Sequence, residues 1–160
     1  MIKLLLLTSI LFNGGLTTKA FAFSDDKLIS FQTDYCTGYP EGTSSEPQLW
    51  KHCCLEHDLY FWAGGDKQDR YNADLRLRSC INQTGNYLQA KLIYMAVRAG
   101  SYSPIKFSGK KWNFGWPLRP THQSLTPEDI DAIELELQHP QYIYLSEELK
   151  SSLLIELRSR

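Results

Sequence analysis

The sequence predicts an all-α fold, in which a disulfide-linked antiparallel pair of helices is followed by additional C-terminal helices. Apolar and aromatic residues recur at three- and four-residue intervals in residues 50–61 and again in residues 73–81, as they do on the buried face of a helix. A short stretch around Gly64-Gly65 separates the two segments, and so short a turn places two helices antiparallel. Cysteines on both segments can join them covalently.

Residues 1–22 have the order of features of a secretory signal peptide. Lys3 precedes an apolar run from Leu4 to Phe12, and the segment ends in the small-residue pattern Ala20-Phe21-Ala22. This run is too short to span a membrane, which takes about 20 apolar residues. We expect cleavage after the last alanine, a single domain over residues 23–160 and a secreted or periplasmic location. The alternative is a buried N-terminal helix.

The charge of the chain argues against nucleic acid as its main partner. The 160 residues include 17 basic and 18 acidic side chains, a formal net charge of −1, and loss of the signal peptide removes two lysines. Binding to nucleic acid depends on a basic surface that neutralises phosphates. The mature chain is acidic, so we expect a partner of another kind.

Four cysteines, all beyond the predicted signal peptide, indicate two disulfides. An exported protein passes through an oxidising compartment, where thiols usually pair. The neighbours Cys53 and Cys54 cannot easily pair with each other, so Cys36 pairs with one of them and Cys80 with the other. The alternative is a metal site made of Cys53, Cys54 and His57, which lie within about one helical turn.

The first helix of the pair is expected to follow a loop and to end at the two glycines. Residues 34–47 are rich in Gly, Pro, Ser and Thr, which favours turns, and Pro47 suits the first turn of a helix. The buried stripe of this helix comprises Trp50, Cys53, Cys54, His57 and Phe61.

The second helix is expected to begin after Asp66, which serves as its N-cap, with Asp69 in the first turn. Because the two helices lie antiparallel, their stripes must face each other. The inward stripe of the second helix comprises Ala73, Asp74, Leu77, Cys80 and Ile81.

Further helices are expected beyond the pair. One runs from about Tyr87 to Ala99 and stops at Gly100, and residues 101–124 are irregular. Thr126 caps a helix that ends at His139-Pro140. Residues 142–145 are predicted to be extended, and Ser146 caps a last helix.

His57 and Asp74 are titratable residues on stripes that should be buried. In an antiparallel pair, residues that share a midpoint along the chain lie at the same level. The midpoint of His57 and Asp74 falls beside the glycine bend, and that of Cys53 and Cys80 falls one residue later, so one hairpin lets both pairs meet. A carboxylate beside an imidazole fixes its tautomer and raises its basicity, as in a general base. The alternative is a structural hydrogen bond between buried groups.

Asp58 is a candidate ligand for Ca²⁺. Neighbouring residues on a helix point about 100° apart, so Asp58 points sideways, toward the loop that carries Cys36, when His57 faces the second helix. Ca²⁺ binds several oxygen ligands, and a glycine-containing loop offers carbonyls. The alternative is that Asp58 is a solvated surface acid.

The run Cys53-Cys54-Leu55-Glu56-His57-Asp58 resembles the Cys-Cys-x-x-His-Asp helix of the secreted phospholipase A2 superfamily. Asp74, followed six residues later by Cys80, is similar to the second helix of that family, and the resemblance covers residues 35–81. It implies that disulfides join Cys36 to Cys54 and Cys53 to Cys80.

The same resemblance implies a catalytic site. His57 would be the general base that deprotonates a water, and Asp74 would hold its imidazole. Ca²⁺ would be bound by Asp58 and the loop residues Tyr35, Thr37 and Gly38, and would polarise the ester carbonyl.

The segment 106–116 mixes lysines with aromatic residues. Trp112 and Trp116 are expected to contact a membrane interface, where aromatic rings lie at headgroup level and lysines meet anionic lipid. The alternative is that these rings fold back over the helix pair and complete its core. The remaining histidines, His52, His122 and His139, are expected at the surface or at caps.

Two functions follow from this sequence. The first is an exported phospholipase A2-like esterase that hydrolyses acyl esters of glycerophospholipids, with a phospholipid or membrane surface as its partner. The alternative is a non-catalytic binding or envelope-structural module on the same helix pair, in which His57 and Asp74 form a buried polar clamp.

Overall fold

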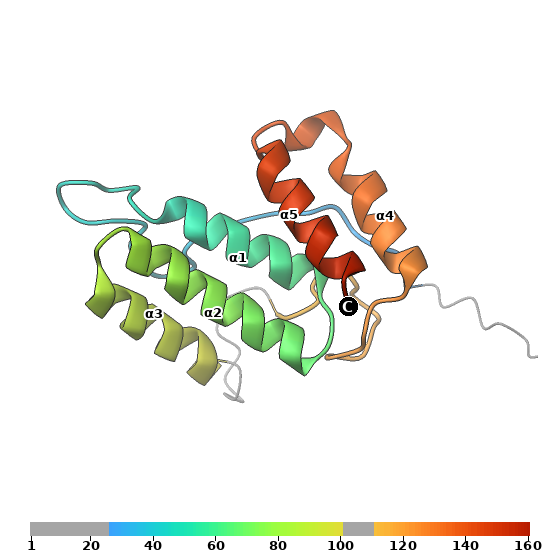
Figure 1. Ribbon diagram of the computed structural model, residues 1–160, viewed down its shortest axis with the longest axis horizontal. Helices are drawn as coiled ribbons and strands as arrows, with labels where there is room; N and C mark the ends of the chain where they lie inside the picture. Colours follow the sequence, from blue (N-terminus) through green and yellow to red (C-terminus); the bar gives the residue numbers. More distant parts are fainter. Residues whose placement is uncertain (1–25, 101–110) are drawn as a thin grey trace, which may run out of the picture.

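The structure is a computed structural model and describes residues 26–100 and 111–160. Every regular element in these ranges is a helix, which confirms the all-α prediction (Figure 1), and none is long and apolar enough to span a bilayer. The predicted signal peptide and residues 106–110 of the lysine-aromatic segment lie outside the described residues. The elements are α1 (Lys51–Ala63), α2 (Lys67–Gln83), α3 (Tyr87–Gly100), α4 (Pro127–Leu137), the 3₁₀ turn η1 (Pro140–Tyr142) and α5 (Glu147–Arg158).

Helices α1 and α2 form the predicted antiparallel hairpin (Figure 1). The bend is made by Gly64 and Gly65, whose φ angles of 80° and 129° are rarely adopted by residues with a side chain. Asp66 caps α2: its carboxylate accepts from the amides of Gln68 and Asp69, and the Asp69 carboxylate accepts from the Asp66 amide. Because the bend is short and its far end is fixed, α1 and α2 pack side by side.

Helix α1 begins at Lys51, later than the position of Pro47 suggested. The contacts of Trp50 explain why the helix starts at this later residue. Its amide donates to the Glu41 carbonyl at 2.9 Å, and its indole Nε1 donates to the Pro40 carbonyl at 2.7 Å. These bonds hold Trp50 to the preceding loop at φ −119° and ψ 18°, outside the helical region. The prediction that Pro47 lies in the first helical turn was wrong.

Both disulfides connect the residues that the family resemblance implied. Cys36 is bonded to Cys54 with a Cα–Cα distance of 5.2 Å, and Cys53 is bonded to Cys80 with a Cα–Cα distance of 5.6 Å. The first ties the loop before α1 to that helix, and the second ties α1 to α2. Two formed disulfides fit a protein of an oxidising compartment.

Helix α3 lies antiparallel to α2 across the turn at Thr84–Asn86 (Figure 1). One face of α3 is buried against the hairpin through Ala90 and Ile93. The opposite face exposes the large apolar side chains Leu88, Leu92 and Met95.

Helices α4 and α5 begin where the sequence predicts. The Thr126 hydroxyl accepts from the Asp129 amide, and the Ser146 hydroxyl accepts from the Leu149 amide. The segment between them is not extended, so the prediction for residues 142–145 was wrong. Tyr142 and Leu145 are buried while the two residues between them are exposed, which is the three-residue spacing of a turn rather than the alternation of a strand.

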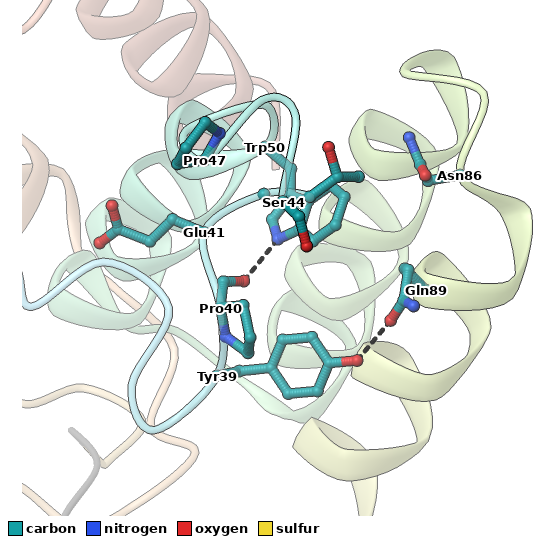
Figure 2. A pocket seen from close by; sticks show the side chains of 10 residues that line it. Tyr39, Pro40, Glu41, Ser44, Pro47, Trp50, Asn86 and Gln89 are labelled. Carbon is teal, nitrogen blue, oxygen red and sulfur yellow. Dashed lines mark hydrogen bonds between the residues drawn. The ribbon is translucent and has the colours of Figure 1, made fainter.

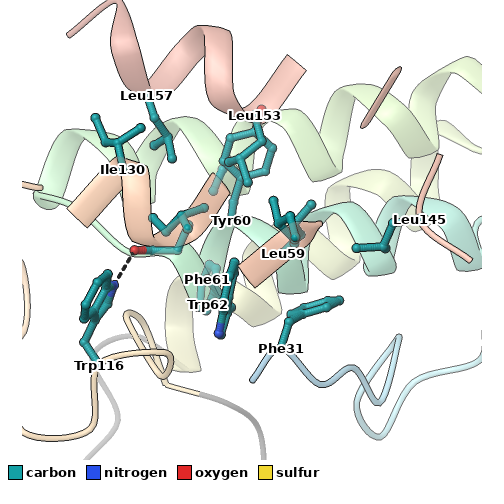
Figure 3. Close-up of a cluster of buried hydrophobic side chains, with 14 of the residues drawn as sticks. Phe31, Leu59, Tyr60, Phe61, Trp62, Trp116, Ile130, Leu145, Leu153 and Leu157 are labelled. Carbon is teal, nitrogen blue, oxygen red and sulfur yellow. Dashed lines mark hydrogen bonds between the residues drawn. The ribbon is translucent and has the colours of Figure 1, made fainter. Parts of the chain in front are cut away.

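Trp112 and Trp116 are each only 3% exposed. Trp112 Nε1 donates to the Gly65 carbonyl at 2.8 Å, and Trp116 Nε1 donates to the Ala63 carbonyl at 2.9 Å (Figure 3). The carbonyls at the end of α1 and in the bend have no hydrogen-bond partner within the helix. Each indole N–H bonds to one of these carbonyls, and each indole ring packs in the core. The prediction that these tryptophans contact a membrane was wrong, and the alternative that they complete the core is confirmed.

The buried apolar side chains form two clusters. The C-terminal core joins the second half of α1 to α4 and α5 and includes Phe31 and Trp116 (Figure 3). Trp112 belongs to the same core. The disulfide cluster joins the start of α1 to α2 and α3, and consists of Trp50, Cys53, Cys54, Leu77, Ile81, Ala90 and Ile93.

The segment before the first helix crosses the C-terminal core. The Ile29 amide donates to the Gly115 carbonyl at 2.8 Å, and the Trp62 indole donates to the Ile29 carbonyl at 2.7 Å. The Phe31 amide donates to the Tyr142 hydroxyl at 2.8 Å. These bonds make the start of the described chain part of the fold.

Candidate active site

His57 of α1 and Asp74 of α2 meet across the hairpin, at the level that their shared midpoint predicts. His57 Nε2 lies 2.9 Å from Asp74 Oδ1. The Asp74 side chain is 0% exposed and the His57 side chain is 10% exposed. Along α1, His57 follows Cys54 of the disulfide cluster and precedes Leu59 of the C-terminal core. The pair therefore lies where the two clusters adjoin, and solvent reaches it through the imidazole.

Phe61, one turn further along α1, fixes the plane of the His57 ring. The two ring centroids lie 4.2 Å apart at an interplanar angle of 39°. Phe61 is itself held by Trp112, which meets it edge-on with centroids 5.1 Å apart. The imidazole is thus constrained at one edge by Asp74 and over its face by an aromatic wall.

This arrangement determines which nitrogen of His57 can act as a base. An ionised carboxylate only accepts hydrogen bonds, so we assign the ring proton to Nε2, which faces Asp74. Nδ1 then keeps its lone pair and can accept a proton. A carboxylate that orients an imidazole in this way is the arrangement of a general base.

Arg98 of α3 is a site residue that the sequence reasoning missed. Its Nη1 donates to Asp74 Oδ2 at 2.8 Å, so both carboxylate oxygens are used. The signal was present in the sequence, because the midpoint of Asp74 and Arg98 is Asn86, in the turn between α2 and α3. Residues whose midpoint falls in a bend lie at the same level of two antiparallel helices. This rule places His57 opposite Asp74 across the first bend, and it also places Asp74 opposite Arg98 across the second.

Asp58 points to the loop before α1, as expected, and is 6% exposed. Its Oδ2 accepts from the Thr33 hydroxyl at 2.7 Å and from the Asp34 amide at 3.3 Å. The alternative of a solvated surface acid is excluded by this burial. Asp58 therefore fastens the loop to α1.

The loop conformation does not fit Ca²⁺ at the residues implied for it. A calcium site needs several oxygen acceptors turned toward one point, whereas the groups on Asp58 Oδ2 are donors. The Tyr35 carbonyl accepts from the Thr37 amide at 3.0 Å, and the Thr37 hydroxyl donates to Asp34. Gly38, with φ 66°, turns the chain beyond them. We derive no chemical step through Ca²⁺.

A metal site based on cysteine is excluded in the oxidised protein. Metal ions bind thiolates, and Cys53 and Cys54 are both in disulfides, so they cannot join His57 as ligands. His52, Cys53 and Cys80 also lie within 4.8 Å of one another, but the two sulfurs of that group are bonded to each other.

A surface cavity of about 760 Å³ lies between the loop before α1 and the start of α3 (Figure 2). Polar groups on its wall bond to each other: Trp50 Nε1 donates to the Pro40 carbonyl, and the Tyr39 hydroxyl donates to Gln89 Oε1. Neither His57 nor Asp74 lines it. The cavity is separate from the dyad.

Comparisons of this chain with protein-family models, with curated proteins and with solved structures gave no match.

Proposed function

We propose that the chain is a phospholipase A2-like esterase, secreted or periplasmic, that hydrolyses an acyl ester of a glycerophospholipid. The observation that carries the proposal is the hydrogen bond between His57 Nε2 and the fully buried Asp74. The Cys-Cys-x-x-His-Asp pattern around His57 and the two disulfides support the same assignment.

In this mechanism His57 acts as the general base. Its Nδ1 takes a proton from a water molecule while the water oxygen bonds to the ester carbonyl carbon. The tetrahedral adduct then breaks the bond between that carbon and the alkoxide oxygen. The proton passes from Nδ1 to the leaving alkoxide, which gives a fatty acid and a lysolipid. Asp74 holds the ring throughout and stabilises its transient positive charge.

Helix α3 supports a phospholipid surface as the partner. Leu88, Leu92 and Met95 are 67%, 41% and 47% exposed, and their spacing places them on one face. The α3 sequence contains Lys91 and no acidic residue, and its other basic residue, Arg98, is paired with Asp74. An exposed apolar face on a basic helix suits the boundary of an anionic bilayer. In this proposal the membrane contact is made by α3 and not by Trp112 and Trp116, which are buried.

The test is hydrolysis of vesicles that contain phosphatidylcholine and phosphatidylglycerol. His57→Gln should lower kcat by about 10²–10⁴-fold, which is the usual contribution of a general base. The exposed neighbour His52→Gln is the matched control and should keep full activity. Fatty acid release and circular dichroism would be measured on the same samples.

The buried-clamp alternative makes the opposite predictions. Wild-type protein would then release no fatty acid from lipids of several headgroups. His57→Ala would instead cost about 1–3 kcal/mol of unfolding free energy, because Asp74 would be left buried with a lost partner. That combination of results would overturn the esterase proposal.

Calcium is tested separately. Because Asp58 is occupied by donors of its own loop, we expect the same activity in a chelator and in about 5 mM Ca²⁺, a concentration that fills weak extracellular sites. The melting temperature should be equally unaffected. A rise with Ca²⁺ in wild type that is absent in Asp58→Ala would restore the site implied by the family resemblance.

A further inference from the structure

Asp74 is held from two sides by residues of two other helices. Oδ1 accepts from His57 of α1 at 2.9 Å, and Oδ2 accepts from Arg98 of α3 at 2.8 Å. The carboxylate is fully buried, whereas the Arg98 side chain is 25% exposed. The three side chains form one hydrogen-bonded network that connects α1, α2 and α3.

We propose that Arg98 is a positioning residue that keeps Oδ1 of Asp74 an acceptor aimed at His57, and so keeps the ring proton of His57 on Nε2. Insofar as it concerns catalysis, this inference rests on the proposed function.

The physical reason is the cost of burying a carboxylate. A charge removed from water is tolerated only with a countercharge and with its lone pairs satisfied, and a neutral imidazole offers one N–H and no charge. Arg98 supplies both the positive charge and the second donor. With both oxygens bound, the carboxylate is held in one orientation, with Oδ1 aimed at His57.

Loss of Arg98 would leave Asp74 two ways to relieve an unpaired buried charge. It could take up a proton and donate it to Nε2, which moves the ring proton of His57 to Nδ1. It could also rotate away from the imidazole and free the ring. In the first case Nδ1 carries a proton, and in the second the ring no longer has a fixed orientation. In both cases the Nδ1 lone pair can no longer accept the proton of the attacking water.

Arg98 is itself held in place by its surroundings. Its guanidinium lies 5.2 Å from the centre of the Tyr71 ring. Tyr71 is in turn hydrogen-bonded to Tyr94, and burial together with that neighbour raises the pKa of Tyr94. Glu56 on α1 is an ionisable neighbour of His57, and among the described residues Arg98 is the cation bonded to Asp74.

The test is nitrogen-15 NMR of the full mature chain near pH 8.5, about two units above the usual pKa of histidine, so that only the tautomer is read. Wild type should show the His57 proton on Nε2 and slow exchange of that proton with water. Arg98→Met should speed this exchange at least tenfold and populate the Nδ1–H form. Arg98→Lys should restore part of the wild-type signal. Arg158→Met, which removes an equal charge from α5, where its partners are Asp131 and Glu134, should change nothing.

Arg98→Gln, which keeps an amide donor without the charge, replaces Arg98→Met if that variant does not fold, and the same result is expected. A wild-type tautomer and exchange rate in the folded charge-free variant would overturn the proposal. In an active enzyme the variant should also lower kcat about 10- to 100-fold, a part of what a general base contributes, with KM unchanged. If no lipid is hydrolysed by wild type, the proposed function fails, while the NMR result still decides the role of Arg98.

Discussion

The two ends of the helix pair are stabilised by different means. The disulfide cluster contains few large apolar side chains and holds two covalent links, Cys36–Cys54 and Cys53–Cys80. The C-terminal core contains buried tryptophans, aliphatic residues from α4 and α5, and no disulfide. Cross-links are therefore found where apolar burial is small, as in small exported domains that cannot build a large core.

The dyad lies between these ends and takes rigidity from both. One turn before His57, α1 is cross-linked to the loop through Cys54. One turn after it, Phe61 packs between the imidazole and Trp112. The geometry of His57 thus depends on a covalent link on one side and on aromatic packing on the other, which can be tested separately.

The largest effect is expected in the C-terminal core, from Trp62→Ala. Trp62 is fully buried, meets Phe31 edge-on with centroids 5.7 Å apart, and bonds to the Ile29 carbonyl. Its loss should cost about 3–5 kcal/mol of unfolding free energy, measured by urea denaturation. Leu118→Ala, at a position 72% exposed, should cost under about 0.5 kcal/mol. A small effect of Trp62→Ala would show that the disulfides stabilise both ends.

A somewhat smaller effect is expected at the other end, from the double variant Cys53→Ala and Cys80→Ala. This disulfide spans 27 residues, and a loop of that length contributes about 3.5 kcal/mol through the unfolded chain. Amide hydrogen exchange should become faster in α2 and α3 and stay slow in α4 and α5. Uniformly faster exchange would contradict the division into two clusters.

The smallest effect is expected at His122, which should make the unfolding free energy depend on pH. Burial, assisted by the nearby cations Arg70 and Lys67, lowers the pKa of His122. The unfolded chain takes up a proton near pH 6.5, while native His122 resists it, so unfolding free energy should fall as the pH drops from 7 to 5.

The control for this effect comes from two matched variants. His122→Asn tolerates the φ of 68° at this position and should reduce the acid-induced loss of stability. His139→Asn, at an exposed position, should leave it unchanged. Equal pH profiles in wild type and His122→Asn would exclude His122 as the cause.

The sequence predicted the parts of the site that follow from helix geometry. Helical spacing and a two-glycine bend are local signals, and they were enough to place His57 against Asp74. Arg98 was within reach of the same reasoning, since the turn at Asn86 is as readable as the first bend. It was missed because a basic residue near a helix end is usually at the surface.

The remaining errors concern irregular segments, where long-range contacts decide the conformation. Trp112 and Trp116 bond to carbonyls about 50 residues earlier in the chain, a preference that no local pattern reveals. Tyr142 turns inward because its hydroxyl meets the Phe31 amide. The loop at Tyr35 is set by hydrogen bonds within it and to Asp58, which a search for carbonyl ligands does not anticipate.

The hydrogen bonds of Ile29 and Phe31 also affect when the chain can complete its fold during synthesis. Trp62, which bonds to the Ile29 carbonyl, is made early, but the partners at Gly115 and Tyr142 are made late, so this segment completes its contacts only after most of the polypeptide has been synthesised. Contacts of such high sequence separation slow folding. Late completion of the fold suits the export proposed for this chain, because a translocation channel threads an unfolded polypeptide.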